Sequence, residues 1–167
     1  MKPALFVIDM QKQFAEINEK TKESLYEAIE YINGAIERFR DKNLPIVCIQ
    51  HFDEEDNLTP GMSGFEIFDE IKIKPADLHI YKTYGNAFNQ TVLSEKLKEL
   101  NVDTVILTGF CAEYCVLSTC RGAEDHDLTP VIFRGALASV KPENIKNIEE
   151  INDVISYRAL CKMIENL

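Results

Sequence analysis

The chain has 167 residues, 46% of them hydrophobic, and these figures predict a single domain that spans residues 1–167. The net charge of −10 disfavours nucleic acids and anionic membranes as partners, because phosphate contacts need a basic surface. No run of about 18 apolar residues occurs, so no transmembrane helix is expected. The five cysteines are an odd number, which favours free thiols in a reducing cytoplasm over a disulfide framework.

Apolar strand-like runs alternate with amphipathic helix-like runs along the chain. This pattern predicts an α/β fold, in which helices cover both faces of a Rossmann-like, mostly parallel sheet in three layers. The predicted strands are residues 4–9, 44–51, 77–82, 104–108, 128–133 and 154–156. The predicted helices are residues 21–42, 92–100, 114–125, 145–150 and 158–166. The longest segment without a predicted element, residues 51–74, is interpreted either as a functional loop or as a solvated surface loop.

Three chemically versatile side chains follow predicted strands. Asp9 ends the first strand, Lys82 ends the third, and Cys115 follows the turn after the fourth. Ligands bind beyond the carboxyl ends of the strands in open parallel sheets, so these side chains are expected near one site. Each also has an ordinary interpretation, because Asp caps turns, Lys faces solvent and free Cys packs in cores. Their occurrence together favours a catalytic site.

The predicted place of Cys115 at a helix N-terminus favours its thiolate, and a nearby Lys82 is expected to lower the pKa of the thiol further. Asp9 could accept the thiol proton and return it to the leaving group. The N–H groups of the preceding turn could hold an oxyanion. These groups together suit attack on an amide or a similar carbonyl.

The other cysteines and the histidines have alternative interpretations. Cys111 is expected in the turn and Cys120 in the core, and their spacing with Cys115 matches no common zinc pattern. His51 ends the second strand and is a candidate substrate contact, a candidate metal ligand next to the acidic residues 53–56, or a surface histidine. No Gly-rich phosphate loop follows the first strand, which argues against a dinucleotide. We therefore expect no cofactor and no metal.

Three segments resemble the isochorismatase-like cysteine hydrolases, a family that includes nicotinamidases, N-carbamoylsarcosine amidases and isochorismatases. Residues 7–14 resemble the opening VIDMQxxF, and residues 82–88 resemble the segment in which a Lys precedes small residues and Phe. Residues 108–116 resemble the TGxxTxxCV nucleophile turn. The predicted order of strands and helices is similar to that of the family over essentially the whole chain.

The resemblance implies a catalytic triad of Asp9, Lys82 and Cys115 in a fold with a six-stranded sheet. It also implies a non-proline cis peptide between Cys111 and Ala112, and an oxyanion hole formed by the N–H groups of Ala112 and Cys115. Ala112 replaces the Thr found in many members, and the segment after the second strand lacks the DxHxxxxH pattern of metal-binding nicotinamidases. Members of the family are often oligomers, so a homo-oligomer is expected.

The resemblance implies hydrolysis of an amide C–N bond in a small molecule, through a thioester on Cys115. Vinyl-ether cleavage of the isochorismatase type, which needs no thiol, is the alternative reaction on the same fold. A non-catalytic interaction module and a redox sensor that uses Cys111 and Cys115 are the alternatives of other classes. The substrate-binding candidates are Phe14, His51, Phe88 and Tyr114, which favour a partly apolar substrate.

Overall fold

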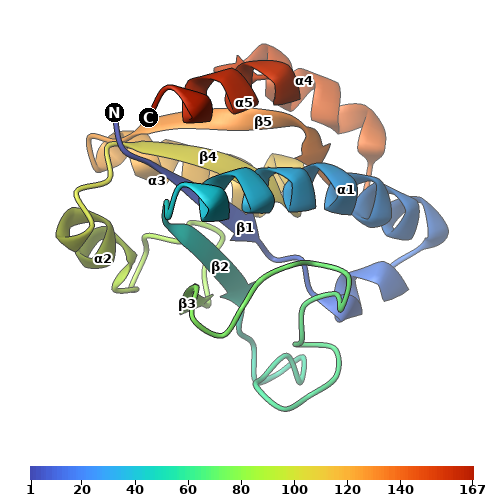
Figure 1. The fold of residues 1–167 in the computed structure, drawn as a ribbon. Helices are drawn as coiled ribbons and strands as arrows, with labels where there is room; N and C mark the ends of the chain where they lie inside the picture. Colours follow the sequence, from blue (N-terminus) through green and yellow to red (C-terminus); the bar gives the residue numbers. More distant parts are fainter.

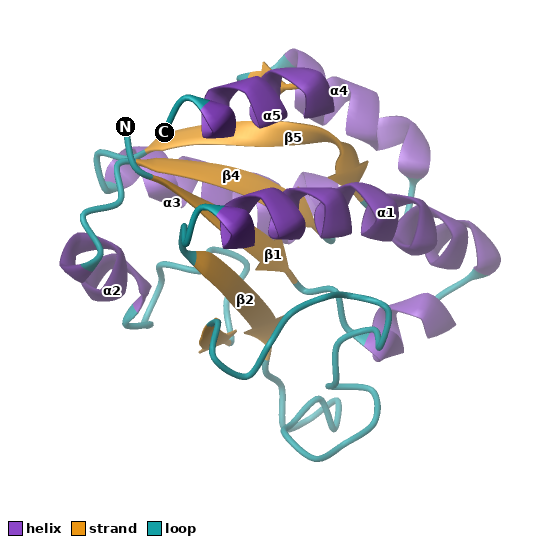
Figure 2. Cartoon of the chain, viewed as in Figure 1, coloured by secondary structure: helices purple, strands orange, loops and turns teal.

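A computed structural model describes residues 1–167 and contains a six-stranded parallel sheet with helices on both faces (Figure 1, Figure 2). The strand order is β3-β2-β1-β4-β5-β6, and every neighbouring pair is parallel. The predicted α/β fold is therefore confirmed. The strands are β1 (Pro3–Ile8), β2 (Ile46–His51), β3 (Leu78–Lys82), β4 (Thr104–Gly109), β5 (Thr129–Leu137) and β6 (Val154–Ile155).

Two layers of helices enclose the sheet. Helices α1 and α5 pack on one face, whereas α2, α3 and α4 pack on the other (Figure 1). The five α-helices are α1 (Glu19–Asp41), α2 (Leu93–Glu99), α3 (Leu117–Asp125), α4 (Ile145–Glu150) and α5 (Tyr157–Glu165). Three short turns complete the chain: the 3₁₀ turns η1 (Lys12–Glu16) and η3 (Pro142–Asn144), and the π-helical turn η2 (Ala112–Val116), which leads into α3.

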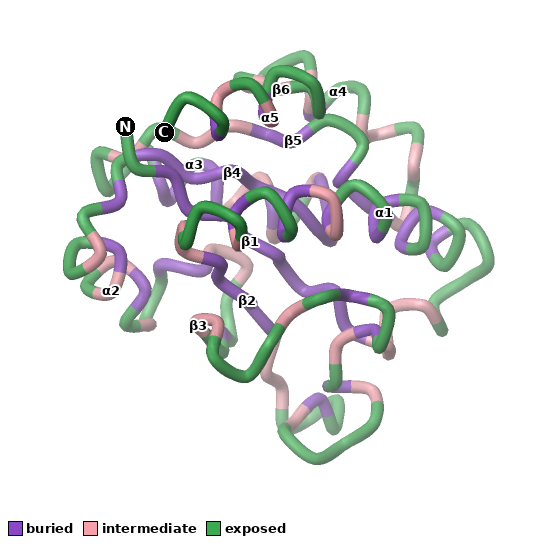
Figure 3. The backbone as a smooth tube through the Cα atoms, in the orientation of Figure 1, coloured by how far each residue is buried: buried purple, intermediate pink, exposed green.

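The central strands and the longest helix follow directly from the pattern of apolar residues. Every residue of β1 and β4 is buried, as expected for near-continuous apolar strands that are covered on both faces (Figure 3). Helix α1 begins where the side chain of Asn18 accepts a hydrogen bond from the Thr21 N–H at 2.9 Å. Its apolar residues recur at helical spacing and fill the core between α1 and the sheet.

Strand β5 extends farther than the sequence pattern predicts. The predicted strand ends at residue 133, whereas β5 continues to Leu137. The exposed residues Arg134 and Gly135 interrupt the apolar pattern, and Gly135 has a φ of 86°. The register between β4 and β5 also shifts between Leu107 and Gly109, so the strand continues through an irregularity that alternation cannot reveal.

The long connection between β2 and β3 lies against the segment that follows β1 (Figure 1). The Lys12 N–H donates to the Glu66 carbonyl at 2.9 Å, and the Phe68 N–H donates to the Met10 carbonyl at 3.1 Å. An isolated antiparallel bridge joins Gln11 to Ile67. These contacts hold the connection at the carboxyl edge of the sheet. None of the helices combines the length and hydrophobicity needed to cross a bilayer.

Candidate active site

Asp9 and Lys82 form a buried ion pair at the carboxyl edge of the sheet. Lys82 Nζ lies 2.8 Å from Asp9 Oδ2, and the two side chains are 0% and 1% exposed. The parallel strands β1 and β3 end at the same edge, with β2 between them, which brings the residues together. Asp9 Oδ1 is also buried but has no hydrogen-bond partner. One carboxylate oxygen therefore binds the ammonium, and the other is free to accept a proton.

A close approach between β1 and β4 brings the turn after β4 beside Asp9. Gly109 has a φ of 107°, and a Cβ at this position would collide with the backbone of Ile8. The Phe110 N–H donates to the Ile8 carbonyl at 2.8 Å, directly before Asp9. Asp9 itself has a φ of 49°, and its N–H donates to Ile49 of β2 at 2.8 Å. The backbones of three neighbouring segments thus fix the position of the carboxylate.

Cys115 lies in η2, half-buried, and both charges of the ion pair act on its thiol. Burial and the Asp9 carboxylate raise the pKa of the Cys115 thiol to about 12, although Lys82 lowers it in part. Lys82 lowers this pKa as expected, but the expectation of a net lowering is wrong, because desolvation and the Asp9 carboxylate outweigh Lys82. The resting thiol is therefore neutral at pH 7.

The turn before Cys115 differs by one residue from the predicted arrangement. The non-proline cis peptide joins Phe110 to Cys111, not Cys111 to Ala112. The Ala112 N–H donates to the Ala138 carbonyl at 2.9 Å, so the prediction that it is free to bind an oxyanion is wrong. The cause is the segment after β5, whose Ala138 pairs with both Gly109 and Ala112. The Cys111 N–H, in contrast, makes no hydrogen bond within the protein.

His51 lies beside the ion pair, as its place at the end of β2 predicts. Its Nδ1 is 3.5 Å from Lys82 Nζ. Its backbone is fixed by Gln11, whose amide donates to the His51 carbonyl at 3.0 Å and accepts from the His51 N–H at 2.8 Å. Burial lowers the pKa of His51, and the charge of Lys82 lowers it further, so the ring is neutral at pH 7. Gln11 is completely buried, and no feature of the sequence predicted its role.

The three aromatic candidates occupy different surroundings. Phe14 stacks on Phe110, with ring centroids 4.9 Å apart, at the turn that leads to Cys115. Tyr114 is 65% exposed next to Cys115. Phe88, in contrast, is buried in the core and lies against the ring of His126 at 4.8 Å. The structure therefore places Phe14 and Tyr114 near the turn and gives Phe88 a packing role.

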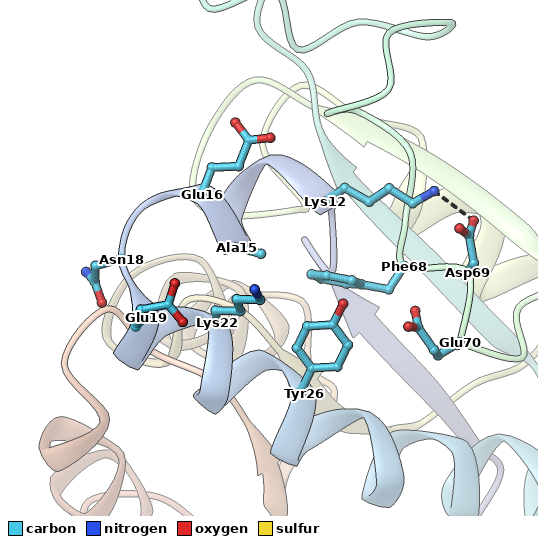
Figure 4. Close-up of a pocket in the computed structure, with 10 residues that line it drawn as sticks. All are labelled: Lys12, Ala15, Glu16, Asn18, Glu19, Lys22, Tyr26, Phe68, Asp69 and Glu70. Atoms are coloured by element: carbon cyan, nitrogen blue, oxygen red, sulfur yellow. Dashed lines mark hydrogen bonds and ion pairs between the residues drawn. The ribbon is translucent and has the colours of Figure 1, made fainter.

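The main surface cavities do not include the ion pair or the thiol. Five cavities of about 410 to 550 Å³ lie on the surface, and none of them is lined by Asp9, Lys82 or Cys115. Figure 4 shows the cavity between η1, the start of α1 and residues 68–70, where Lys12 pairs with Asp69 at 2.7 Å. Asp9 and Lys82 are thus enclosed, whereas Cys115 is partly exposed.

The residues at the site do not fit a metal centre. No three side chains of His, Cys, Asp or Glu come together in a metal-binding group. In the acidic segment 53–56, Asp53 Oδ1 accepts hydrogen bonds from the Glu55 and Asp56 N–H groups at 2.9 and 3.3 Å. This carboxylate therefore stabilises its own turn, and His51 faces Lys82.

Residues 3–152 match the family model described as the Isochorismatase domain. The chain belongs to the isochorismatase family. The uncharacterized family protein YrdC of Bacillus subtilis is 31% identical over 122 residues, which are 72% of this chain and 65% of YrdC. The secreted isochorismatase effector Isc1 of Verticillium dahliae is 33% identical over 120 residues, which are 70% of this chain and 62% of Isc1. The chain thus spans less than two thirds of the length of these two relatives.

Solved structures of isochorismatase-family proteins share the fold. N-carbamoylsarcosine amidase from Thermoplasma acidophilum superposes with a TM-score of 0.80 at 29% identity, over 94% of this chain and 97% of that chain. Pyrazinamidase of Pyrococcus horikoshii, solved in complex with zinc, gives a TM-score of 0.79 at 22% identity, over 93% and 99% of the two chains. At this identity the second likeness concerns the fold alone.

Proposed function

We propose that this isochorismatase-family chain hydrolyses the C–N bond of a small neutral amide through a thioester on Cys115. The observation that carries the proposal is the buried Asp9–Lys82 pair, which leaves Asp9 Oδ1 without a partner and acts on the Cys115 thiol. The structural likeness to N-carbamoylsarcosine amidase supports it. So does the ureidoacrylate amidohydrolase RutB of Caulobacter segnis, 24% identical over 95 residues, which are 57% of this chain and 40% of RutB.

Acylation begins with a neutral thiol, because burial disfavours the thiolate. Asp9 Oδ1 takes the thiol proton while the Cys115 sulfur attacks the amide carbonyl carbon. The negative charge that develops on the carbonyl oxygen is stabilised by backbone donors, for which we propose the Cys111 and Cys115 N–H groups. Asp9 then gives its proton to the leaving nitrogen, the C–N bond breaks, and ammonia or an amine departs. Lys82 compensates the charge of Asp9 in the resting site.

Deacylation reverses these roles with water as the nucleophile. Asp9 takes a proton from the water, whose oxygen attacks the thioester carbon. The C–S bond breaks, Asp9 returns the proton to the sulfur, and a carboxylic acid leaves. The sum is amide plus water giving acid plus amine, so the cycle needs no cofactor. The neutral ring of His51 lies within reach of the same cluster and is a candidate substrate contact.

The lysines that follow β1 and end β3 are both paired, which favours a neutral substrate. Lys82 is paired with Asp9, and Lys12 is paired with Asp69. The arginines lie on helices or within β5 and not in the loops that follow the strands: Arg38, Arg40, Arg121, Arg134 and Arg158. An anionic substrate would need a free cation to offset the nearby carboxylates. Isochorismate carries two carboxylates, so vinyl-ether cleavage gains no support from this site.

The test compares two cysteine variants on a panel of small neutral amides. Cys115→Ala should reduce turnover by about 10³-fold or more, since it removes the nucleophile. Cys120→Ala, at a buried free cysteine on α3, is the matched control and should keep near-normal turnover. Mass spectrometry of the wild type with substrate should detect the acyl group on Cys115. Full turnover by Cys115→Ala would overturn the proposal.

A further inference from the structure

Glu113 lies between Cys111 and Cys115, and both of its carboxylate oxygens are engaged inside the protein. Ser139 Oγ donates to this carboxylate, with distances of 2.8 and 2.6 Å to its two oxygens. The Asn144 amide donates to Oε1 at 2.9 Å, and Cys111 Sγ donates to Oε2 at 3.2 Å. One carboxylate thus joins the turn after β4 to the segment after β5.

The segment that Glu113 holds is itself firmly anchored. Ser139 is completely buried, and its N–H donates to the Ser24 hydroxyl of α1 at 3.2 Å. Ser139 Oγ also accepts the Lys141 N–H at 2.9 Å. The Ala112 N–H donates to Ala138 at 2.9 Å, which adds a backbone link beside the carboxylate link. The turn is therefore attached to a fixed part of the structure.

The protonation states of Glu113 and Cys111 determine which group donates and which accepts in these hydrogen bonds. Burial alone would raise the pKa of Glu113, but the hydrogen bonds from Ser139 and Asn144 outweigh it, and the pKa is lowered. Burial raises the pKa of the Cys111 thiol to about 11, so this group is a neutral donor. An ionised acceptor therefore faces a protonated thiol and a hydroxyl. Charge-assisted hydrogen bonds of this kind are stronger and shorter than neutral ones.

We infer that Glu113 is a positioning residue that orients Cys111, so that the unpartnered Cys111 N–H faces the carbonyl oxygen of the group attacked by Cys115. The inference rests on the proposed function. Glu113 does not touch the reacting atoms, because its oxygens are occupied by Ser139, Asn144 and Cys111. A negative charge close to an oxyanion would oppose it, so the contribution of Glu113 is geometric.

Two reagents separate this role from a general effect on the thiol. Acylation of Cys115 by p-nitrophenyl acetate forms an oxyanion, whereas alkylation by iodoacetamide forms none. Glu113→Ala should lower the acylation rate constant by about 10- to 100-fold, which is less than the roughly 10²- to 10³-fold loss when an oxyanion donor is removed outright, because the Cys111 N–H is displaced and not deleted. The alkylation rate of Cys115 in this variant should stay within about threefold of the wild-type rate, since the substitution leaves the thiol and its base in place. Peptide mapping assigns each adduct to Cys115.

The matched control is Glu143→Ala, which removes the same charge from an exposed neighbour of Asn144 that makes no hydrogen bond. It should leave both rates unchanged. Glu113→Gln keeps one carbonyl oxygen for Ser139 and should recover part of the acylation rate. If Glu113→Ala does not fold, Asn144→Ala decides, because it removes one partner of the carboxylate from η3 and should lower acylation alone.

The outcomes are distinguishable. If the wild-type Cys115 is not acylated, the proposed function fails and the inference fails with it. If the wild type is acylated but Glu113→Ala and Asn144→Ala leave acylation unchanged, the inference is overturned and the function stands. A parallel fall of acylation and alkylation would also overturn it, because that result indicates a displaced nucleophile rather than a displaced oxyanion donor.

Discussion

Lys82 Nζ lies 2.8 Å from Asp9 Oδ2 although the two residues are 73 positions apart, and neither side chain is more than 1% exposed. Each charge is stabilised by the other, because a buried charge without a partner has lost its hydration and gained no compensating interaction. Loss of either partner alone should therefore destabilise the fold as well as alter the candidate active site.

Lys82→Met should lower the free energy of unfolding by about 3–5 kcal/mol, since it leaves the Asp9 carboxylate buried and unpaired. Urea denaturation monitored by circular dichroism measures the change. Lys12→Met is the control, because it breaks a surface ion pair of similar length. Lys12 lies 2.7 Å from Asp69, compared with 2.8 Å between Lys82 and Asp9. That variant should leave stability nearly unchanged. Equal losses in the two variants would contradict the prediction.

Buried cysteines should make the protein sensitive to alkaline pH. Cys48 is completely buried, and burial raises the pKa of its thiol from 9.0 to about 12. The folded state holds this proton more tightly than the unfolded chain, so the stabilisation is complete below pH 9 and is lost as pH rises from 9 towards 12. In Cys48→Ala the dependence of stability on pH above 9 should be shallower by up to about 1.4 kcal/mol per pH unit.

The measurement is the free energy of unfolding of wild type and Cys48→Ala at several pH values between 7 and about 11. Lysines and tyrosines titrate in both proteins, so their contributions cancel in the difference. A constant difference between the two proteins over this interval would refute the effect, whatever the size of the cavity left by the substitution.

Gly109→Ala should destabilise the protein strongly, by about 3 kcal/mol or more, because a collision with the backbone of Ile8 adds to the strain of a positive φ. Gly61→Ala is the matched control, since Gly61 also has a positive φ of 92° but has nothing within 4 Å of an added Cβ. Its cost should be about 1 kcal/mol. Thermal and urea denaturation measure the loss of unfolding free energy in each variant. Similar losses in the two variants would contradict this prediction.

A negative charge on the substrate should reduce turnover. Nicotinamide and 5-carbamoylnicotinate present the same ring and amide, and the second adds a carboxylate. We expect kcat/KM to be at least about tenfold higher for the neutral compound, which corresponds to about 1.4 kcal/mol of repulsion or lost solvation. Steady-state ammonia release measures both values. A preference for the anion would contradict the prediction and indicate a cation that binds the added carboxylate.

Most of the fold could be predicted from the sequence because its elements are strongly periodic. The apolar runs of β1 and β4 and the helical spacing in α1 carry clear signals, and strand ends located Asp9 and Lys82. The end of β5 could not be predicted, since it continues past a glycine and an exposed arginine. Homo-oligomerisation and a cytoplasmic location stay predictions of the sequence and its family resemblance.

The details of the turn before Cys115 depend on residues that are distant in the chain. The Ala112 N–H donates to the Ala138 carbonyl, and the Ser139 hydroxyl donates to Glu113, although the members of each pair are 26 positions apart. A local motif contains no information about such partners. The raised pKa of Cys115 has a similar origin, because it arises from burial and from Asp9, which is 106 positions away in the chain.

Lys82 is the last residue of β3, which pairs with β2 alone and forms the outer margin of the sheet. Fraying of this strand would withdraw the ammonium from Asp9 while the central strands stay intact. The attraction between the two charges therefore stabilises the paired position of this edge strand. One local opening would therefore expose the β3 amides to hydrogen exchange and also disrupt the site around Cys115. We expect variants that lose protection of these amides to lose reactivity at Cys115 as well.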